Sequence, residues 1–287
     1  MAGRAQEGSA EIQRAPGRLV IVGGGEDRRG ERTILRRFTD LAGGPDARIV
    51  VIGTATTVPD DVGPAYLEAF ADLVGEVDFL PVGSRDEANS AETLSLVEKA
   101  TGVYFTGGDQ LRIASIIGGS QIDVHLHAAY ADGLVVGGTS AGAAMMSSTM
   151  IIGGGDSVPA TDGVRLGPGL ELLHGVVIDM HFAERGRLGR LLAAVAQFPH
   201  ELGVGIDEDT ALVVEGNRFE VVGRGAVTVV DAGAVTSLRT PGEDGTGPLA
   251  MTSVQLHVLP AGFSFDLSTR LPVLLDDRKD QDRDGGD

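Results

Sequence analysis

Residues 133–146 read GLVVGGTSAGAAMM, an apolar run followed by a glycine-rich turn and a second apolar run. Within it, residues 138–142 match Gly-X-Ser-X-Gly, a pattern in which a strand turns sharply into a helix and exposes a serine side chain. Small residues at 138 and 142 allow this crowded turn, and the N-terminus of the helix favours a developing negative charge. The stretch predicts a strand–turn–helix unit with Ser140 as a candidate nucleophile.

Two other interpretations of these glycines remain open on the pattern alone. A chain with 43 glycines can contain Gly-X-Ser-X-Gly by accident. A serine-lined phosphate cradle uses similar glycines, but the lysine of a Walker motif is missing from this stretch. The choice between them depends on the sequence on either side.

Short apolar runs alternate with amphipathic segments around this unit. Apolar runs that end in glycine-rich or polar turns predict buried strands, and apolar residues spaced by three and four predict helices. Such alternation indicates an α/β fold with a mostly parallel sheet covered on both faces. After about residue 203 the runs shorten and fit hairpins or edge strands. The predicted strands are 18–25, 47–55, 76–82, 102–108, 133–142 and 175–182, and the predicted helices are 30–42, 61–74, 89–100, 109–131, 141–149 and 184–198.

Composition and charge restrict the function. Lys and Arg number 23 against 41 Asp and Glu, and the net charge of −18 disfavours a partner that is a nucleic acid or an anionic membrane. The absence of cysteine excludes disulfides, thiolate metal sites and a cysteine nucleophile. The start has no apolar stretch of the kind a signal peptide needs, and no run of about 18 uncharged apolar residues follows. We therefore expect a soluble cytoplasmic protein.

The two ends of the chain differ from its centre. Residues 1–17 are small and polar without periodicity, and residues 276–287 alternate acids and bases with nothing to bury. No Pro- or Ser-rich linker and no sequence repeat interrupts the region between them. We expect a disordered N-terminal tail over 1–17, a single domain over 18–275 and a disordered acidic tail over 276–287.

A serine nucleophile needs a base, and the sequence contains six histidines. His181 follows the apolar run GVVID at the far end of a predicted strand, where chemistry gathers in open parallel sheets. His174 begins that strand instead. His181 is therefore the preferred base. Structural roles are favoured for the other four histidines, which are His125, His127, His200 and His257.

The orienting acid is less determined by the pattern. Asp207, Glu208 and Asp209 share a turn between two apolar runs, from which a carboxylate could reach an imidazole. Three solvated turn acids are the more common meaning of such a turn, so the residues alone leave the acid open. The chain order serine, histidine, acid also differs from that of α/β-hydrolases. A triad here would therefore need another scaffold.

Five motifs occur in order between about residues 18 and 230: IVGGGED (21–27), YFTGGDQLRI (104–113), GGTSAGAAMM (137–146), IDMHFAERGRLGRLL (178–192) and GVGIDEDTALVV (203–214). Together they resemble the cyanophycinase family of serine peptidases, relatives of the aspartyl dipeptidase E group. The resemblance implies a three-layer α/β/α fold like that of class I glutamine amidotransferases, which is flavodoxin-like, with serine in place of their cysteine.

The resemblance also implies the roles of the central residues. Ser140 would be the nucleophile, His181 the general base and Glu208 the residue that orients the imidazole. A close backbone approach to a reacting carbonyl tolerates no side chain, which suits a glycine pair. The oxyanion hole would be formed by backbone N–H groups near Gly107 or Gly108 and at Ala141.

Enzymes of this family hydrolyse cyanophycin, a poly-aspartate whose β-carboxyl groups are amide-linked to arginine, and release β-Asp-Arg dipeptides. The resemblance implies the same reaction through an acyl-enzyme, without a metal or organic cofactor, in a homodimer. HExxH and clustered histidine ligands are also missing from the sequence. One alternative is a dipeptidase that acts on aspartyl or β-aspartyl peptides but not on the polymer, and another is a non-catalytic ligand-binding homologue.

Arginines and an amide supply candidate substrate contacts. Gln110 matches a family substrate-binding position, and its amide both donates and accepts. Arg185, Arg187 and Arg190 follow His181, and their guanidinium groups suit the aspartate carboxylates of a substrate. The alternative for Arg187 and Arg190 is an internally paired helix.

Two residues beside the base have two interpretations each. Asp179 either faces a substrate cation or ends the strand. Met180 stands where we expect Gln in the D-X-H-F motif of the family, and a thioether cannot make the hydrogen bonds of an amide. If position 180 contacts the dipeptide, the change affects polymer specificity. If Met180 fills the core, it is a repacking.

Overall fold

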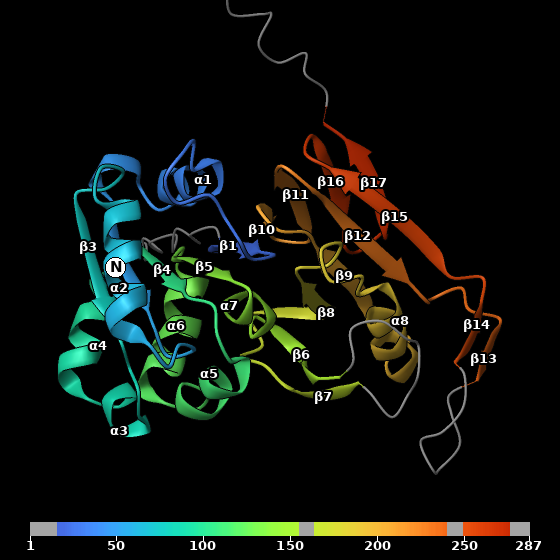
Figure 1. Ribbon diagram of the computed structural model, residues 1–287, viewed down its shortest axis with the longest axis horizontal. Coiled ribbons are helices and arrows are strands. Elements are labelled where there is room, and N and C mark those ends of the chain that lie inside the picture. Colours follow the sequence, from blue (N-terminus) through green and yellow to red (C-terminus); the bar gives the residue numbers. More distant parts are fainter. Residues whose placement is uncertain (1–15, 155–163, 240–248, 276–287) are drawn as a thin grey trace, which may run out of the picture.

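The computed structural model describes residues 16–154, 164–239 and 249–275. Figure 1 shows two groups of strands, one surrounded by most of the helices and the other forming the opposite half of the molecule. Residues 1–15 of the predicted N-terminal tail and the whole predicted acidic tail, 276–287, lie outside the described residues.

The first sheet contains the glycine-rich serine turn. Its central strands are almost fully buried, as strands covered on both faces must be. In the order given below, the last five strands run parallel, and the other neighbours pair antiparallel. The strand order is β17 (Leu271–Leu274), β16 (Phe263–Asp266), β11 (Arg218–Gly223), β10 (Thr210–Glu215), β1 (Arg18–Val22), β5 (Val135–Thr139), β4 (Gly102–Phe105), β2 (Arg48–Ile52) and β3 (Glu76–Leu80).

Helices cover both faces of the parallel strands. On one face, Phe38 of α1 (Thr33–Leu41) and Phe70 of α2 (Pro59–Phe70) pack against Tyr104 of β4. The described residues thus confirm an α/β fold, and this layering is compatible with the predicted three-layer arrangement. The helices on the other face are α3 (Arg85–Ala88), α4 (Ala91–Val97), α5 (Gln110–Ile116), α6 (Gln121–Ala131) and α7 (Ala141–Ala144).

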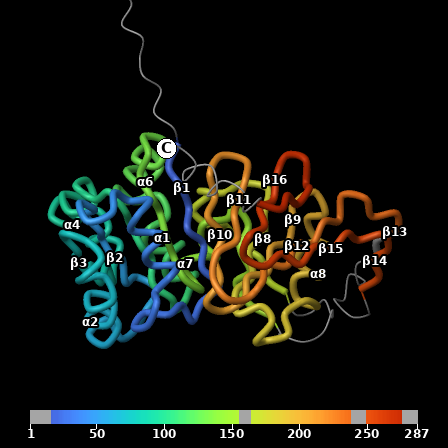
Figure 2. The backbone as a smooth tube through the Cα atoms, turned by 90° about the horizontal axis from the view of Figure 1, so that it is seen from above, coloured from blue at the N-terminus to red at the C-terminus, as the bar shows by residue number. Residues whose placement is uncertain are grey.

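A second, six-stranded sheet lies beside the first (Figure 2). One face of this sheet is covered by α8 (Leu188–Gln197). A single hydrophobic cluster includes Ile178 of this sheet and Leu212 of the first sheet. The two sheets therefore share a core. The strand order is β15 (Gln255–Pro260), β12 (Ala226–Asp231), β9 (Leu202–Ile206), β8 (Leu173–Met180), β6 (Ser147–Gly153) and β7 (Arg165–Pro168), and β13 (Ser237–Arg239) pairs with β14 (Ala250–Thr252) in a separate hairpin.

The structure differs from two helix predictions. The helix predicted over 141–149 ends at Ala144, and β6 begins at Ser147, because the sequence STMII is rich in β-branched residues that favour strands. The helix predicted over 109–131 is two helices, since Ser120 breaks the run and caps α6 by accepting from the N–H of Asp123. In the described ranges, no helix is long and apolar enough to cross a membrane.

Candidate active site

Ser140 occupies the sharp turn between β5 and α7. Its backbone has φ 53° and ψ −110°, a conformation that residues with a side chain rarely adopt, and its N–H donates to the carbonyl oxygen of Val22 at 3.0 Å. A Cβ on Gly138 would lie 2.4 Å from the carbonyl oxygen of Gly142, and one on Gly142 would lie 2.4 Å from that of Phe105. Both glycines of the motif are therefore required by the close approach of the backbone.

His181 follows β8 of the second sheet and faces Ser140 of the first. Its Nε2 lies 2.9 Å from Ser140 Oγ, and its own N–H donates to the carbonyl oxygen of Gly23 at 2.8 Å. Only 14% of the imidazole side chain is exposed. A Cβ on Gly24 would lie 2.2 Å from Cε1 of the ring, so the loop after β1 needs a glycine to close over the imidazole.

Glu208 lies in the turn between β9 and β10, with its Oε1 2.6 Å from His181 Nδ1. Its two neighbours have other partners. The carboxylate of Asp207 accepts backbone N–H groups from Ala183 and Ala226, each at 3.0 Å. Asp209 Oδ1 accepts the N–H of Asp27 at 2.9 Å. The structure thus separates the three acids that the sequence left open, and only Glu208 contacts the imidazole.

Serine, imidazole and carboxylate form a continuous hydrogen-bonded chain. If Nδ1–H of His181 donates to Glu208, Nε2 is left as the acceptor that the hydroxyl of Ser140 needs. An imidazole in this position can take the hydroxyl proton while the carboxylate stabilises the resulting imidazolium. The arrangement therefore suits nucleophilic acyl transfer.

The glycine pair expected at the oxyanion hole follows β4, and its first member, Gly107, lies next to Ser140. A Cβ on Gly107 would be 3.4 Å from Cβ of Ser140. Gly108 has φ 142°, and its Cβ would be 2.2 Å from the carbonyl oxygen of Ala55, so only glycine fits. Within the described ranges, the N–H groups of Gly107, Gly108 and Ala141 donate to no other residue. These donors could bind a developing oxyanion.

Two predicted substrate contacts reach the surface. Gln110 is the first residue of α5, and its Nε2 donates to the carbonyl oxygen of Ile151 at 2.7 Å, which leaves the amide oxygen as an acceptor. Arg185 is exposed in the segment that follows His181, and its N–H donates to the carbonyl oxygen of His181 at 3.1 Å.

For Asp179, Arg187 and Arg190 the structure favours the internal alternative, and contact with substrate stays a prediction. Their exposed fractions are 0%, 6% and 7%. Arg190 Nε donates to Asp179 Oδ2 at 2.8 Å, its Nη2 contacts Oδ1 of the same carboxylate, and Arg187 Nη1 donates to the carbonyl oxygen of Met180 at 2.6 Å. Because a buried charge must be paired, these three side chains satisfy one another inside the protein.

Met180, next to the proposed base, also lies in the interior. Its side chain is 6% exposed and belongs to the main hydrophobic cluster. Of its two interpretations the structure therefore favours the repacking, because a flexible thioether fills space between core side chains.

Glu26 is a site residue that the sequence reasoning did not single out. It is 7% exposed, and its Oε1 accepts from the hydroxyl of Tyr66 at 2.6 Å while its Oε2 accepts from the hydroxyl of Thr139 at 2.5 Å. Burial, and then the charge of Glu26, raise the pKa of Tyr66 well above its usual value, so the phenol stays a donor. Since Thr139 precedes Ser140, Glu26 ties the loop after β1 to the serine turn. The motif IVGGGED contains this residue but gives it no role.

No group of three or more His, Cys, Asp or Glu side chains in the described part of the chain is placed to hold a metal ion.

Comparison with known proteins shows the family of the chain. The pattern of Peptidase family S51 matches residues 19–222. A cyanophycinase of Synechococcus elongatus is 40% identical over 88% of this chain and 80% of its own length, and one of Geminocystis herdmanii is 36% identical over 89% and 95%. A crystal structure of a peptidase from an acI-B1 Actinobacterium has the same fold, with a TM-score of 0.67 at 20% identity over 88% of this chain and 98% of that one. Because the family pattern and these relatives cover most of its length, the chain belongs to Peptidase family S51.

Proposed function

We propose that the protein is a serine exopeptidase that hydrolyses cyanophycin to β-Asp-Arg dipeptides. The observation that carries the proposal is the chain of contacts from Ser140 through His181 to Glu208, at 2.9 and 2.6 Å. The cyanophycinases among its relatives, at 36% to 40% identity, supply the substrate.

In the first half of the reaction, Ser140 Oγ attacks the scissile carbonyl carbon while His181 Nε2 takes the hydroxyl proton. Glu208 stabilises the imidazolium, and N–H groups of Gly107 or Gly108 and of Ala141 bind the oxyanion. His181 then gives the proton to the leaving amine, the C–N bond breaks, and an ester to Ser140 remains.

In the second half, water enters in place of the leaving amine. His181 takes a proton from the water as its oxygen attacks the ester carbonyl. The C–O bond to Ser140 breaks, and the proton returns to the serine oxygen. Gln110 and Arg185, which both reach the surface, are the proposed polar contacts that hold the substrate chain.

The test is release of β-Asp-Arg from purified cyanophycin, measured by mass spectrometry. Ser140→Ala should lower kcat by about 10³-fold or more. A matched control is Ser148→Ala, because Ser148 Oγ contacts His174 Nδ1 at 2.7 Å in an exposed serine–histidine pair without an acid. An undiminished rate in Ser140→Ala would favour the non-catalytic alternative, and no release by the wild type would refute the assignment of the polymer.

A dipeptidase that acts on aspartyl or β-aspartyl peptides is the second candidate, because the same chain of contacts from Ser140 through His181 to Glu208 can cleave either kind of substrate. Assays of Asp-X and β-Asp-X dipeptides beside cyanophycin separate the two candidates. Turnover of the dipeptides without release of β-Asp-Arg from the polymer would select the dipeptidase.

The proposal includes a homodimer. Support comes from β15 and β17, which carry five of the exposed large apolar side chains and whose outer edges pair with no other described strand, so that they can join another chain. The exposed side chains are Leu256, Val258, Leu271, Val273 and Leu274. Light scattering after chromatography tests the homodimer, with Leu271→Lys expected to favour the monomer.

A cytoplasmic location stays a prediction of the sequence, and cell fractionation tests it.

A further inference from the structure

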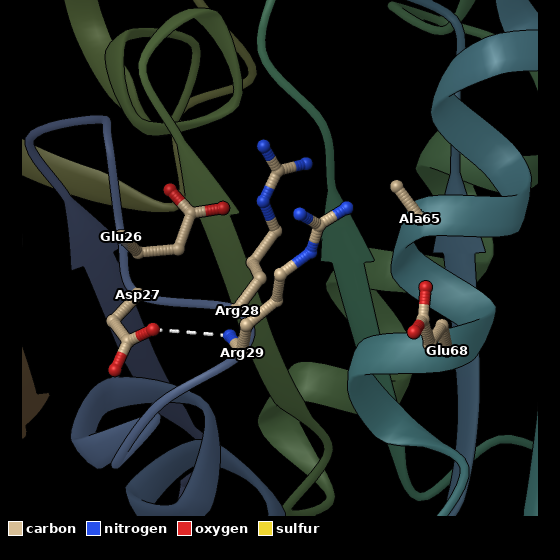
Figure 3. A pocket seen from close by; sticks show the side chains of 6 residues that line it. All are labelled: Glu26, Asp27, Arg28, Arg29, Ala65 and Glu68. Atoms are coloured by element: carbon tan, nitrogen blue, oxygen red, sulfur yellow. Dashed lines mark hydrogen bonds between the residues drawn. The ribbon is translucent and has the colours of Figure 1, made fainter.

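A pocket of about 400 Å³ lies between the loop that follows β1 and helix α2 (Figure 3). This volume is in the range of sites that hold small ligands. Its walls carry more charge than a core cavity would. The lining residues are Glu26, Asp27, Arg28, Arg29, Ala65 and Glu68.

Two of the three acids in the pocket already have partners. Both oxygens of Glu26 accept hydroxyl groups, as described above. Asp27 accepts the N–H groups of Gly30, Arg29 and Arg32 at 2.7, 3.0 and 3.1 Å, and these bonds lower its pKa to about 2. The loop is thus fixed by its own carboxylate. Asp27 keeps its negative charge, but its oxygens accept these backbone N–H groups and bond to neither the Arg28 nor the Arg29 guanidinium.

Arg28 and Arg29 are exposed, and neither forms an ion pair with a described residue. The guanidinium carbon of Arg28 lies 5.1 Å from the ring centroid of Tyr66. Figure 3 shows both guanidinium groups extending in the same direction, between Glu26 on one side and Ala65 and Glu68 of α2 on the other. Two adjacent unpaired cations in a chain with a net charge of −18 are suited to binding an anion.

The same loop contacts the catalytic residues. Glu26 bonds to Thr139, the residue before Ser140. A Cβ on Gly24 would meet the ring of His181, and one on Gly25 would lie 2.9 Å from Glu208 Oε2. The loop that lines the pocket therefore also contacts residues around the proposed nucleophile. The pocket lies on the face of the sheet that α1 and α2 cover, whereas Gln110 begins a helix on the opposite face.

We propose that this pocket binds one arginyl group of the substrate, with its free carboxylate on Arg28 and Arg29 and its guanidinium on Glu68. The inference rests on the proposed function, since each unit of the polymer carries an arginine with both charged ends free. Guanidinium groups bind a carboxylate through paired, charge-assisted hydrogen bonds. Glu68 is exposed on the opposite wall without an ion pair to a described residue, and it supplies the complementary anion.

Calorimetric titration of the Ser140→Ala protein tests the proposal without turnover. The probes are the β-Asp-Arg dipeptide, the same dipeptide with the arginine carboxyl amidated, and β-Asp-citrulline, which lacks the guanidinium charge. We expect the amide and the citrulline compound each to bind about 10-fold more weakly than β-Asp-Arg. Failure of β-Asp-Arg to bind would overturn the proposal.

Substitutions then assign each charge to its wall. In the Ser140→Ala protein, the added substitutions Arg28→Gln and Arg29→Gln should weaken the binding of β-Asp-Arg about 10-fold. They should also abolish the preference for the carboxylate over the amide. Adding Glu68→Gln should abolish only the preference for arginine over citrulline. The matched control adds Arg18→Gln and Arg48→Gln to the Ser140→Ala protein. These arginines begin β1 and β2, at the opposite end of the strands from the pocket, so the binding of all three probes should be unchanged.

The proposal is overturned if the Arg28 and Arg29 substitutions leave the carboxylate preference intact. The test of this pocket and the test of the proposed function can fail separately. A wild-type protein that does not cleave the polymer would refute the latter, while carboxylate-dependent binding of β-Asp-Arg to this pocket would still stand.

Discussion

Two pairs of arginines near the proposed catalytic residues differ in almost every physical respect. Arg187 and Arg190 are buried beside Asp179, close to the proposed base, whereas Arg28 and Arg29 are exposed in an open pocket lined by the loop that follows β1. The buried pair lies close to His181 in sequence, and the exposed pair lies more than a hundred residues from Ser140. Sequence proximity to a catalytic residue therefore did not indicate which cations are available to a ligand.

The difference follows from the environment of each charge. A guanidinium that is bonded to a buried carboxylate can bind a ligand only by leaving that carboxylate uncompensated, which costs several kcal/mol. An exposed guanidinium is hydrated and exchanges water for a ligand at little cost. The buried pair should thus act on stability and the exposed pair on binding, and four substitutions test this division.

The largest effect is expected for Asp179→Asn. The substitution leaves two buried cations without their carboxylate, and the free energy of unfolding should fall by about 3–5 kcal/mol. Denaturant unfolding followed by circular dichroism measures it. A loss below about 1 kcal/mol would mean that water or other groups compensate the arginines, and the contrast between the two pairs would be lost.

A smaller loss is expected for Glu26→Ala. The hydroxyl groups of Tyr66 and Thr139 would lose a buried acceptor, at a cost of about 1–3 kcal/mol. The same unfolding experiment measures it, with Glu68→Gln as the exposed control that should have no effect. Equal stabilities of the two variants would show that Glu26 is not needed to hold the serine turn.

The acid sensitivity of the exposed loop gives a third test. Asp27 has a pKa of about 2 in the folded protein, below its ordinary value of 3.8, so its stabilising contribution is present above pH 4 and is lost as the pH falls toward 2. Asp27→Asn removes this titration. The stability of the wild type should therefore fall more steeply between pH 4 and pH 2 than that of the variant, as urea unfolding at each pH would measure. Arg28→Gln should keep the slope of the wild type, and equal slopes in all three proteins would contradict the prediction.

The smallest effect is expected for the double variant Arg28→Gln, Arg29→Gln. Since neither side chain forms an ion pair with a described residue, the free energy of unfolding should stay within about 0.5 kcal/mol of the wild type. A thermal melt monitored by calorimetry checks this. A clear loss of stability would indicate that the pair has a structural role, as the buried pair does.

Much of the fold was predictable from local patterns. The runs at 18–25, 47–55, 102–108 and 133–142 each contain a strand of the parallel sheet, because strands buried on both faces leave continuous apolar sequence. The second sheet was not predicted, and the first three residues of β6 were assigned to a helix. Its strands pair over long sequence distances, as β8 does with β9, and periodicity carries no information on such partners.

The candidate site was predictable where the backbone imposes a motif. Gly138 and Gly142 mark the turn of Ser140 because no larger side chain fits, so this position can be read from sequence. The role of Glu208 came from the resemblance, since its neighbour Asp207 looks the same in sequence and differs only in its three-dimensional partners. Arg187 and Arg190 pair internally because they are buried, and no local sequence pattern indicates that burial.

The division of the proposed catalytic residues between two sheets has a consequence for the nascent chain. Ser140 ends a strand of the first sheet, His181 ends a strand of the second, and Glu208 lies in the turn that connects them. During translation the nucleophile is made 68 residues before the acid, as 208 − 140 gives. Until the sheets dock, Ser140 has no base and is an ordinary alcohol. On the proposed mechanism, hydrolysis therefore requires both sheets to be in place.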